Sequence, residues 1–553
     1  MDQTLTGTRA AGIRAGWHWL GLAGLLIAEF ILLDWLISRH HAWIYPRWND
    51  QIQYLTEAYT GYEYLKGNGL FPGLWQTLVN PSAQGTLHDF FAVLIFTLTG
   101  PSRSAALSVN LFYLLAWQAA FFLAVIKSTR SRALAFASAG LVLAFHSAWS
   151  GGPGSVVDFR LDWMACCAMG LALAVALCAE EFRSTRWSLA FGAAVGFVLL
   201  TRFLTGAYFV VIFAALLAWC LAGDQRGRRA CNVLLAALAA FVIAAPCFWL
   251  NRDWVYNYYL IGHFTGPESA IRSPNMGLMR STGWLWHNWW SLHVGAKCAW
   301  LIAGSTLGLV VAAWLGRNRD GATAVPAAKT TTSGWITLAA IFLFAPALVL
   351  TLHSQKSELV LSIMLPGAAA LVLGCWQRVA GHRGARKFLP VLGWGVPVIA
   401  GLLMVQAMSA PAGPEFADSA RKVNELADYL YRTQLTAQLD NPRIGVDQVT
   451  DSLDGQIMRV LCYERHKVWV PFIMTLPTGI MEDKPEVLMA RLAQSDFMFL
   501  TDRMPGEGPW PYDKQMRRLY PQLKAWCEQN MRPVEAFTLF GRQMMLYQRR
   551  DIP

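Results

Sequence analysis

Residues 1 to 38, MDQTLTGTRAAGIRAGWHWLGLAGLLIAEFILLDWLIS, decide the fold class of this chain. The stretch begins with two arginines, Arg9 and Arg14, and continues as an apolar run of about 22 residues, which is long enough to cross the hydrocarbon core of a bilayer. Basic residues before an apolar segment are also typical of a signal peptide, but no small-residue cleavage site follows here. The run therefore predicts a first membrane span that is retained.

The composition of the whole chain is that of a polytopic membrane protein. Of its 553 residues, 55% are hydrophobic and only 15% are charged, and 25 are tryptophans. Ordinary soluble proteins carry more charge. The net charge of +11 would suggest a nucleic-acid partner in a soluble chain, but most basic residues lie in short loops between apolar runs, where they set the orientation of the spans. We therefore expect membrane lipids, and no nucleic acid, among the partners.

Ten further apolar runs follow the first one, so the sequence predicts about eleven spans with the two termini on opposite sides of the membrane. Every second connector is basic, for example KSTRSR, DQRGRRA and QRVAGHRGARK. Because basic connectors stay in the cytoplasm, the N-terminus is predicted inside and the C-terminus outside. The predicted spans are residues 17–38, 105–126, 133–149, 163–179, 187–201, 206–222, 231–250, 297–316, 335–352, 359–376 and 388–408.

Three longer segments then face outward: residues 39–104, residues 251–294 and the tail after the last span. We predict a transmembrane module over residues 1–409 and a small extracytoplasmic α/β domain over residues 410–553. In the tail, RIGVDQV, KVWVPFIM and DFMFLTD have the pattern of short strands, KPEVLMARLAQ that of a helix, and VEAFTLFGRQMMLYQ that of a terminal strand pair. The fold class is thus mainly α, a helical bundle with an α/β domain at its end.

Cysteine usage adds little to this prediction. Of ten cysteines, eight lie in or beside apolar runs without metal-ligand spacing. The other two, Cys462 and Cys527, lie in the tail, and the sequence leaves open whether they form a disulfide there.

The chemistry is expected in the outer loops, because the cytoplasmic loops are too short to build a site and charges inside the bilayer are costly. One acid with several cations at this surface fits sugar transfer from a lipid-linked sugar phosphate to a hydroxyl. The leaving phosphate needs Arg and Lys to compensate its charge, and the acceptor hydroxyl needs a base. A glycosidase would instead need two carboxylates at a fixed separation. The outer loops contain Asp50, Lys66, His88, Asp89, Asp158, Arg160, Asp162, Arg202, His263, Glu268, Arg272, Arg280, Lys356 and Glu358.

Three stretches resemble the GT-C glycosyltransferases, the superfamily of the protein mannosyltransferases and the lipid A aminoarabinose transferases. WNDQIQYLTEAY has an acid at the start of a long first outer loop, HSQKSELVLSIMLPGAAALVLG is similar to the late motif of the family, and LLTRFLTGAYF resembles its short basic hairpin. The arrangement of many spans before an outer α/β tail covers nearly the whole chain. Where the family has a Pro-Pro-Leu type stretch, this chain has QGTLHDFF, which leaves the roles of His88 and Asp89 open.

The resemblance implies an enzyme that moves a hexose or pentose from a polyprenyl monophosphate to a hydroxyl of a glycan, lipid or protein, with inversion. Asp50 would be the catalytic base, and Asp158 a second acid that orients the acceptor. The two acids are also the candidate ligands of a divalent metal, Mg²⁺ or Mn²⁺, whose presence stays open. The residues implied for the donor phosphate are Lys356, Arg202, Arg280 and Arg272. The residues implied for orienting the substrates are Arg160, Lys66, His88, Asp89, His263 and Glu358.

The same residues also have purely structural interpretations. Asp50 could cap a surface helix, and Asp158 could form an ion pair with Arg160 that closes a loop. Lys356 and Arg202 could be basic residues at helix ends that reach for the headgroups.

Two other functions fit a similar composition. A transporter or lipid flippase would gather its charges at broken helices in the middle of the membrane, whereas here they gather in outer loops. An O-antigen ligase-like transferase would use a diphosphate donor and usually lacks a globular C-terminal domain. A composition rich in Ala, Arg and Gly favours a bacterial inner membrane, with the site facing the periplasm.

Overall fold

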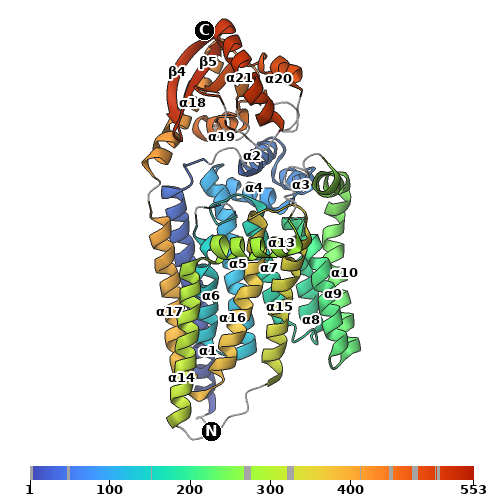
Figure 1. The fold of residues 1–553 in the computed structure, drawn as a ribbon. Coiled ribbons are helices and arrows are strands. Elements are labelled where there is room, and N and C mark those ends of the chain that lie inside the picture. Colours follow the sequence, from blue (N-terminus) through green and yellow to red (C-terminus); the bar gives the residue numbers. More distant parts are fainter. Residues whose placement is uncertain are drawn as a thin grey trace.

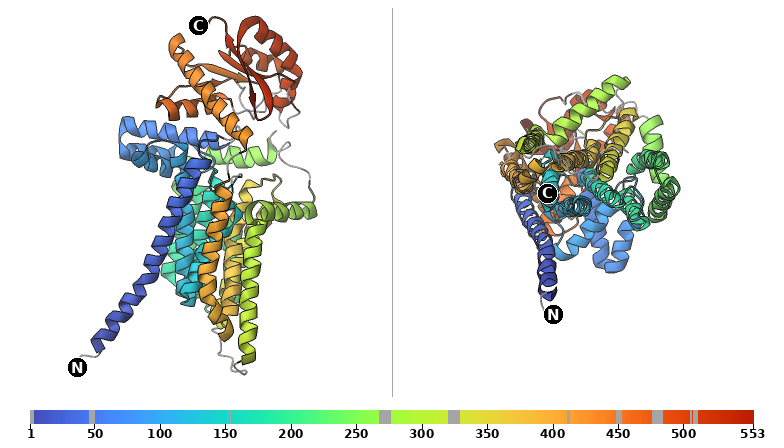
Figure 2. Two further views of the ribbon diagram at one scale, coloured as in Figure 1. Left: turned by 90° about the vertical axis from the view of Figure 1, so that its left-hand side faces the viewer. Right: turned by 90° about the horizontal axis from the view of Figure 1, so that it is seen from below.

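The structure is a computed structural model of the chain, and it is mainly helical (Figure 1). It describes residues 4–45, 50–150, 152, 154–266, 276–319, 329–410, 413–447, 453–475, 484–504, 506 and 511–553. A bundle of long helices carries a layer of helices across one end, and a small α/β domain lies beyond that layer (Figures 1 and 2). The first helix starts at the opposite end of the bundle from the C-terminal domain. The predicted fold class is confirmed.

Among the described residues, nine helices are long and apolar enough to cross a membrane, and they coincide with nine of the eleven predicted spans. The chain is therefore an integral membrane protein. The other two predicted spans, 133–149 and 187–201, correspond to α6 (Arg132–Ala144) and α8 (Thr185–Thr201), which have only 13 and 17 residues. The nine are α1 (Thr4–His40), α5 (Arg103–Thr129), α7 (Leu161–Cys178), α9 (Thr205–Ala222), α10 (Arg226–Leu250), α14 (Ala296–Arg319), α15 (Lys329–Leu352), η4 with α16 (Leu359–Met364 and Leu365–Ala380) and α17 (Arg383–Met408).

Two acids inside the first span are paired within the bundle. Glu29 accepts a hydrogen bond of 3.0 Å from the side-chain amide of Gln118, and Asp34 accepts one of 3.1 Å from the hydroxyl of Ser108. Both partners lie on α5. A polar group in an apolar interior is costly unless it is hydrogen-bonded, so these pairs explain how the span tolerates its acids.

The two long outer loops fold into the layer that lies across the bundle (Figure 2, left). Residues 39–104 form α2 (Asp50–Asn68), α3 (Leu70–Val79) and α4 (Leu87–Thr99), and α5 begins at Arg103. Residues 251–294 form α11 (Arg252–Val255), the π-helical segments η2 (Tyr256–Thr265) and η3 (Trp289–Val294), and α13 (Leu278–Asn288). A short turn of helix, η1 (His146–Ala148), follows α6.

The C-terminal domain is a five-stranded sheet with helices on both faces. The strand order is β2-β1-β3-β5-β4; β1 is parallel to β2 and β3, and β5 is antiparallel to β3 and β4. The strands form where the sequence predicts them, although β1 and β2 are shorter. The elements are α18 (Pro414–Ala437), β1 (Arg443–Val446), α19 (Gly455–His466), β2 (Ile473–Met474), α20 (Pro485–Leu492), β3 (Phe497–Thr501), α21 (Pro511–Asn530), β4 (Met531–Leu539) and β5 (Arg542–Arg549).

The sheet separates the two tail cysteines. Alternate residues of β3 enter different clusters, with Phe497 on the side of Cys462 and Met498 on the side of Cys527. Both cysteines are buried free thiols. The structure therefore has no disulfide between them.

The domain docks on the transverse layer through α19 and α2. The Tyr59 hydroxyl of α2 donates to the carboxylate of Glu464 on α19, and the Tyr463 hydroxyl donates to Glu63 of α2. The rings of Tyr59 and Tyr463 lie 5.2 Å apart between these bonds. The helix that begins at Asp50 is thus held from above by the C-terminal domain.

Candidate functional site

Asp50 is the first residue of α2, and its side chain is exposed. A carboxylate is favourable at the N-terminus of a helix, where backbone N–H groups have no partner within the helix. One turn further on, Tyr54 is buried, and burial raises its pKa, with the charge of Asp50 adding to the effect. Asp50 therefore lies close enough to Tyr54 for its charge to act there, and it keeps contact with solvent.

Asp158 lies in the loop before α7 and is 3% exposed. Its carboxylate accepts from the backbone N–H of Gly154 at 2.7 Å, from the guanidinium of Arg160 at 2.8 Å and from the side-chain amide of Gln51 at 3.1 Å. Burial raises the pKa of Asp158, and the guanidinium opposes that rise. Gln51 follows Asp50 directly, so Asp158 is tied to the start of α2.

Arg160 is held by several acids at once. Burial alone would lower its pKa, but the charges of Asp158, Asp162 and Asp50 raise it. Its ion pair with Asp158 has an N–O distance of 2.8 Å. The structure therefore contains the ion pair that closes the loop, and places it next to Asp50.

Arg103 is a further buried cation of this site, which the sequence analysis did not select. It donates to Gln51 at 2.8 Å and to the backbone carbonyls of His41, Ala42 and Ile44 at 2.8 to 3.1 Å. The first residue of α5 thus joins the end of α1 to the start of α2. An arginine at the first turn of an apolar run would have been a usable signal.

Arg202 is the residue after α8 and forms an ion pair with Asp162, in the first turn of α7. Burial alone would lower the pKa of Arg202, but Asp162 and the neighbouring tyrosines together raise it, so the guanidinium stays charged. Its Nε–H has no hydrogen-bond partner among the residues that the structure describes. One donor of this partly buried cation is therefore available to a ligand.

The loop that carries Gln84 and Gly85 packs against this arginine. The N–H of Phe203 donates to the carbonyl of Gln84 at 2.7 Å, and the N–H of Thr86 donates to the carbonyl of Leu200 at 3.0 Å. A side chain at Gly85 would meet the backbone oxygen of Thr201 at 2.3 Å, so only glycine permits this approach. The QGTLHDFF stretch thereby fixes the hairpin of Arg202.

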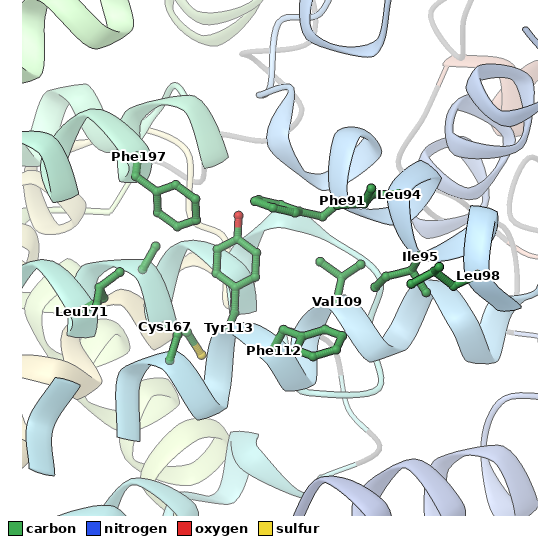
Figure 3. Close-up of a pocket in the computed structure, with 12 residues that line it drawn as sticks. Phe91, Leu94, Ile95, Leu98, Val109, Phe112, Tyr113, Cys167, Leu171 and Phe197 are labelled. Atoms are coloured by element: carbon green, nitrogen blue, oxygen red, sulfur yellow. The ribbon is translucent and has the colours of Figure 1, made fainter. Parts of the chain in front are cut away.

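An apolar cavity of about 430 Å³ lies between α4, α5, α7 and α8 (Figure 3). Tyr113 lines it, and its hydroxyl lies 3.1 Å from that of Thr201, the neighbour of Arg202. Phe197, one turn before Thr201, closes the same end. The remaining lining is Phe91, Leu94, Ile95 and Leu98 of α4, Val109, Phe112 and Ala116 of α5, and Cys167, Ala168 and Leu171 of α7. The cavity is thus walled by apolar side chains, and Tyr113 links it to Thr201, the residue before Arg202.

Lys356 lies in the loop after α15 and caps that helix. Its ammonium donates to the backbone carbonyls of Leu350 at 3.1 Å, Thr351 at 2.9 Å and His353 at 2.6 Å. An ammonium has three donors, and all are used here. Nearby, Glu358 is exposed, and its backbone carbonyl lies 2.8 Å from Nε2 of the buried His293.

The remaining selected residues take no part in the ion pairs of Asp158 and Asp162 in the described structure, although His263 packs on Tyr259, which lies near Arg202. Lys66 is at the far end of α2 and pairs with Glu63 at 3.0 Å. His263 of η2 has its ring 5.4 Å from that of His353, and Arg280 of α13 is exposed. Arg272, predicted for the phosphate, and Glu268 lie outside the described residues.

His88 and Asp89 belong to a separate buried cluster. They lie in the first turn of α4 beside Glu57 of α2. Burial raises the pKa of Glu57 to about 7, and the charge of Asp89 adds to this rise. The ring of His88 packs edge-on against Tyr54, with the centroids 4.9 Å apart.

Comparison with known proteins identifies the fold. No protein-family model matches the chain, and no curated protein matches it. Solved structures with a similar fold include ArnT from Cupriavidus metallidurans bound to undecaprenyl phosphate, with 14% identity and a TM-score of 0.57, over 95% of this chain and 98% of that one. The apo state of that ArnT aligns over the same shares, with 14% identity and a TM-score of 0.56. The chain therefore has the fold of ArnT, as the resemblance to lipid A aminoarabinose transferases implied.

Proposed function

We propose that this chain is a membrane glycosyltransferase that moves a sugar from a polyprenyl monophosphate to a hydroxyl acceptor, with inversion. The observation that carries the proposal is the apolar cavity in a chain with the fold of ArnT. That ArnT was crystallised with undecaprenyl phosphate. A cavity with apolar walls suits an isoprenoid chain, and Tyr113 of this cavity contacts Thr201, the neighbour of a cation that would receive the phosphate head.

Arg202 is the first candidate for binding the phosphate. A guanidinium suits a phosphate because its planar fork can donate two parallel hydrogen bonds. The N–H at Nε that lacks a protein partner supports this role, and the ion pair with Asp162 fixes the position of the group. Lys356 would also contact the phosphate only if its ammonium gave up its hydrogen bonds to the carbonyls at the end of α15. Arg280 and Arg272 stay candidates for contacts with the lipid headgroup.

Asp50 is the proposed base. Its carboxylate removes the proton of the acceptor hydroxyl while that oxygen attacks the anomeric carbon of the donor sugar. The new bond joins the acceptor oxygen to this carbon, and the bond between the carbon and the phosphate oxygen breaks. The phosphate leaves with the electron pair, and Arg202 compensates its charge. A single displacement of this kind inverts the configuration at the anomeric carbon.

Asp158 acts indirectly in this scheme. Both of its oxygens accept hydrogen bonds from Arg160, and Gln51 and Gly154 donate to them as well. It therefore orients Gln51 and, through it, the start of α2. The acceptor, whether glycan, lipid or protein, approaches Asp50 from the space below the C-terminal domain. We further propose that this face is the periplasmic side of a bacterial inner membrane.

The test is a transfer assay with purified full-length protein in detergent. Radiolabelled sugar on a polyprenyl monophosphate should be released or transferred with inversion, whereas the same sugar on a polyprenyl diphosphate should not react. Preference for the diphosphate would support a ligase-like enzyme instead. A chain that moves the lipid between leaflets of a vesicle without cleaving the sugar phosphate bond would be a flippase, and the proposal would be wrong.

A further inference from the structure

A cluster of one histidine and two acids joins two helices of the transverse layer. Glu57 comes from α2, and His88 and Asp89 come from α4. Each residue can offer one ligand atom, and these three atoms all lie within 4.8 Å of one another. Nitrogen and oxygen ligands bind a divalent metal at about 2.0 to 2.2 Å, so a small shift of the side chains brings all three atoms around one ion.

Three polar atoms of His88 and Asp89 are buried and lack a hydrogen-bond partner in the described part of the chain. His88 is 1% exposed and Asp89 is 6% exposed. Neither ring nitrogen of His88 has a hydrogen-bond partner there, nor does Oδ1 of Asp89. Nε2 of His88 does lie 3.1 Å from that oxygen, but the two groups are not aligned as a hydrogen bond. Buried polar atoms of native proteins are nearly always satisfied, so this cluster lacks a component.

Electrostatics indicates that the missing component is a cation. Two carboxylates in one buried cluster repel each other unless a positive charge lies between them. Glu57 receives one hydrogen bond, of 2.8 Å, from Gln53 on its own helix, and one of its carboxylate oxygens lies within 4.8 Å of ligand atoms of His88 and Asp89. The alternative without a metal is that His88 is protonated and supplies the positive charge. A protonated imidazole would, however, be expected to align its N–H groups with the acids.

We propose that Glu57, His88 and Asp89 bind one divalent metal ion, with Zn²⁺ as the best match. Imidazole nitrogen together with carboxylate oxygen is a ligand set that Zn²⁺ accepts, whereas Mg²⁺ prefers oxygen ligands and retained water. Three protein ligands leave the remaining position to water. This site differs in place and in metal from the Mg²⁺ or Mn²⁺ site expected at Asp50 and Asp158.

The metal would position α2 and would not touch the reacting atoms. Glu57 comes two turns after Asp50, on the same face of the helix and about 10 Å further along it. Tyr54 lies between them and packs on the ring of His88. A metal that bridges α2 and α4 would fix the helix from below, while α19 holds it from above. This inference does not depend on the proposed transferase activity.

The test measures bound metal directly. Purified full-length protein is stripped with a chelator, desalted, equilibrated with Zn²⁺ alone and analysed by mass spectrometry for zinc per chain. The wild type should hold about one ion, and Glu57→Gln, His88→Gln and Asp89→Asn should each weaken binding by at least about tenfold. The matched control is His287→Gln, which removes an exposed histidine of α13 and should bind as the wild type does.

A second readout covers variants that fold poorly. Zn²⁺ should raise the melting temperature of the wild type and of His287→Gln, because a ligand that binds only the folded state stabilises it. Zn²⁺ should not raise the melting temperature of Glu57→Gln. Glu57 is half-buried, so its replacement by glutamine should leave the protein folded. A wild type without bound zinc, or a Glu57→Gln variant that binds it equally well, would overturn the proposal.

Discussion

Asp50 differs from the other acids of the outer face because it is exposed, begins a helix and has no cation paired with it in the described residues. Asp158 and Asp162 are both buried in ion pairs with arginines. A base must be free to accept a proton and to meet the acceptor, and a carboxylate saturated by hydrogen bonds does neither well. This contrast favours Asp50 over Asp158 as the base.

Asp50→Asn keeps the size of the side chain and removes the base. Turnover in the transfer assay should fall by about a hundredfold to ten-thousandfold, the usual range for a general base, with little change in donor affinity. The control is Asp253→Asn, an exposed acid of α11 whose side chain is 81% exposed. If Asp50→Asn kept nearly full turnover while remaining folded, the base would lie elsewhere.

Arg202→Lys tests the phosphate site while retaining the charge that Asp162 requires. Lysine lacks both the planar fork and the Nε–H, so one charge-assisted hydrogen bond to the phosphate is lost. A loss of about 1.5 kcal/mol corresponds to roughly a tenfold rise in the KM for the lipid donor. Arg252→Lys, at an exposed arginine of α11, should leave KM unchanged. Equal KM values in both variants would remove Arg202 from the donor site.

Lys356→Ala should mainly affect stability, because the ammonium caps α15. Three partly buried carbonyls lose their donor, which should cost about 1 to 3 kcal/mol of stability and lower the melting temperature. The KM for the donor should change much less than in Arg202→Lys. Lys514→Ala, at an exposed position of α21, is the stability control. A folded Lys356→Ala protein with a tenfold higher KM would instead support the phosphate role that its sequence motif suggested.

At the residue scale, the sequence suggested one of the two ion pairs of this loop. The spacing in DFRLDW allowed a pair between Asp158 and Arg160, but only the structure shows that Asp162 pairs with Arg202. Successive polar residues before a helix point in different directions, and their partners come from other spans. The sequence did not single out Arg103, because a basic residue beside an apolar run is common and does not by itself indicate a buried site.

At the element scale, the periodic segments were predictable and the docking between them was not. The tail strands form where alternation predicted them, and the spacing of Val423, Leu426, Ala427 and Leu430 in α18 contains a helical signal that was available. The contact of α19 with α2 joins residues about 400 positions apart, for example Tyr59 and Glu464. Nothing in a single sequence specifies such a pair.

The contact between α19 and α2 should depend on pH through Glu464. Burial raises the pKa of this carboxyl above its usual 4.5. An acid whose pKa is raised on folding contributes stability that is fully present below its unfolded pKa and is lost as the pH rises through the folded pKa. Glu464→Gln is neutral at every pH, so its melting temperature relative to that of the wild type should increase as the pH rises above 4.5.

The control for this comparison is Glu486→Gln, an exposed acid of α20 in the same domain. Its melting temperature should differ from that of the wild type by an amount that does not change with pH. A difference between Glu464→Gln and the wild type that shrank with rising pH would mean that the ionised carboxylate is the stabilising form. Arg103 and Tyr59, whose N–H and hydroxyl donate to it, would then outweigh burial.

For the whole molecule, the two short helices of the bundle lead into the loops of the site. Helices α6 and α8 follow the basic connectors of the inner end, at Arg130 to Arg132 and at Arg183 to Arg186. With 13 and 17 residues they rise about 20 and 25 Å, less than the roughly 30 Å of the hydrocarbon core. Each of these helices is thus too short to cross the hydrocarbon core by itself, and the loops of Asp158 and Arg202 follow their C-terminal ends.

The last prediction concerns the orientation of the whole chain. The structure has the start of α1 and the C-terminal domain at opposite ends of the bundle, which requires an odd number of crossings (Figure 1). Nine long spans satisfy this condition, and so do eleven when α6 and α8 are added. The basic connectors lie at the end of the bundle where α1 begins, so this end should be cytoplasmic.

Alkaline phosphatase, which is active only outside, should be active when fused after Pro553 and inactive when fused after Arg386, at the start of α17. Green fluorescent protein at the same two positions should give the reverse result and controls for expression. Fusions that place both positions on the same side would contradict an odd number of spans, and with it a site that faces outward.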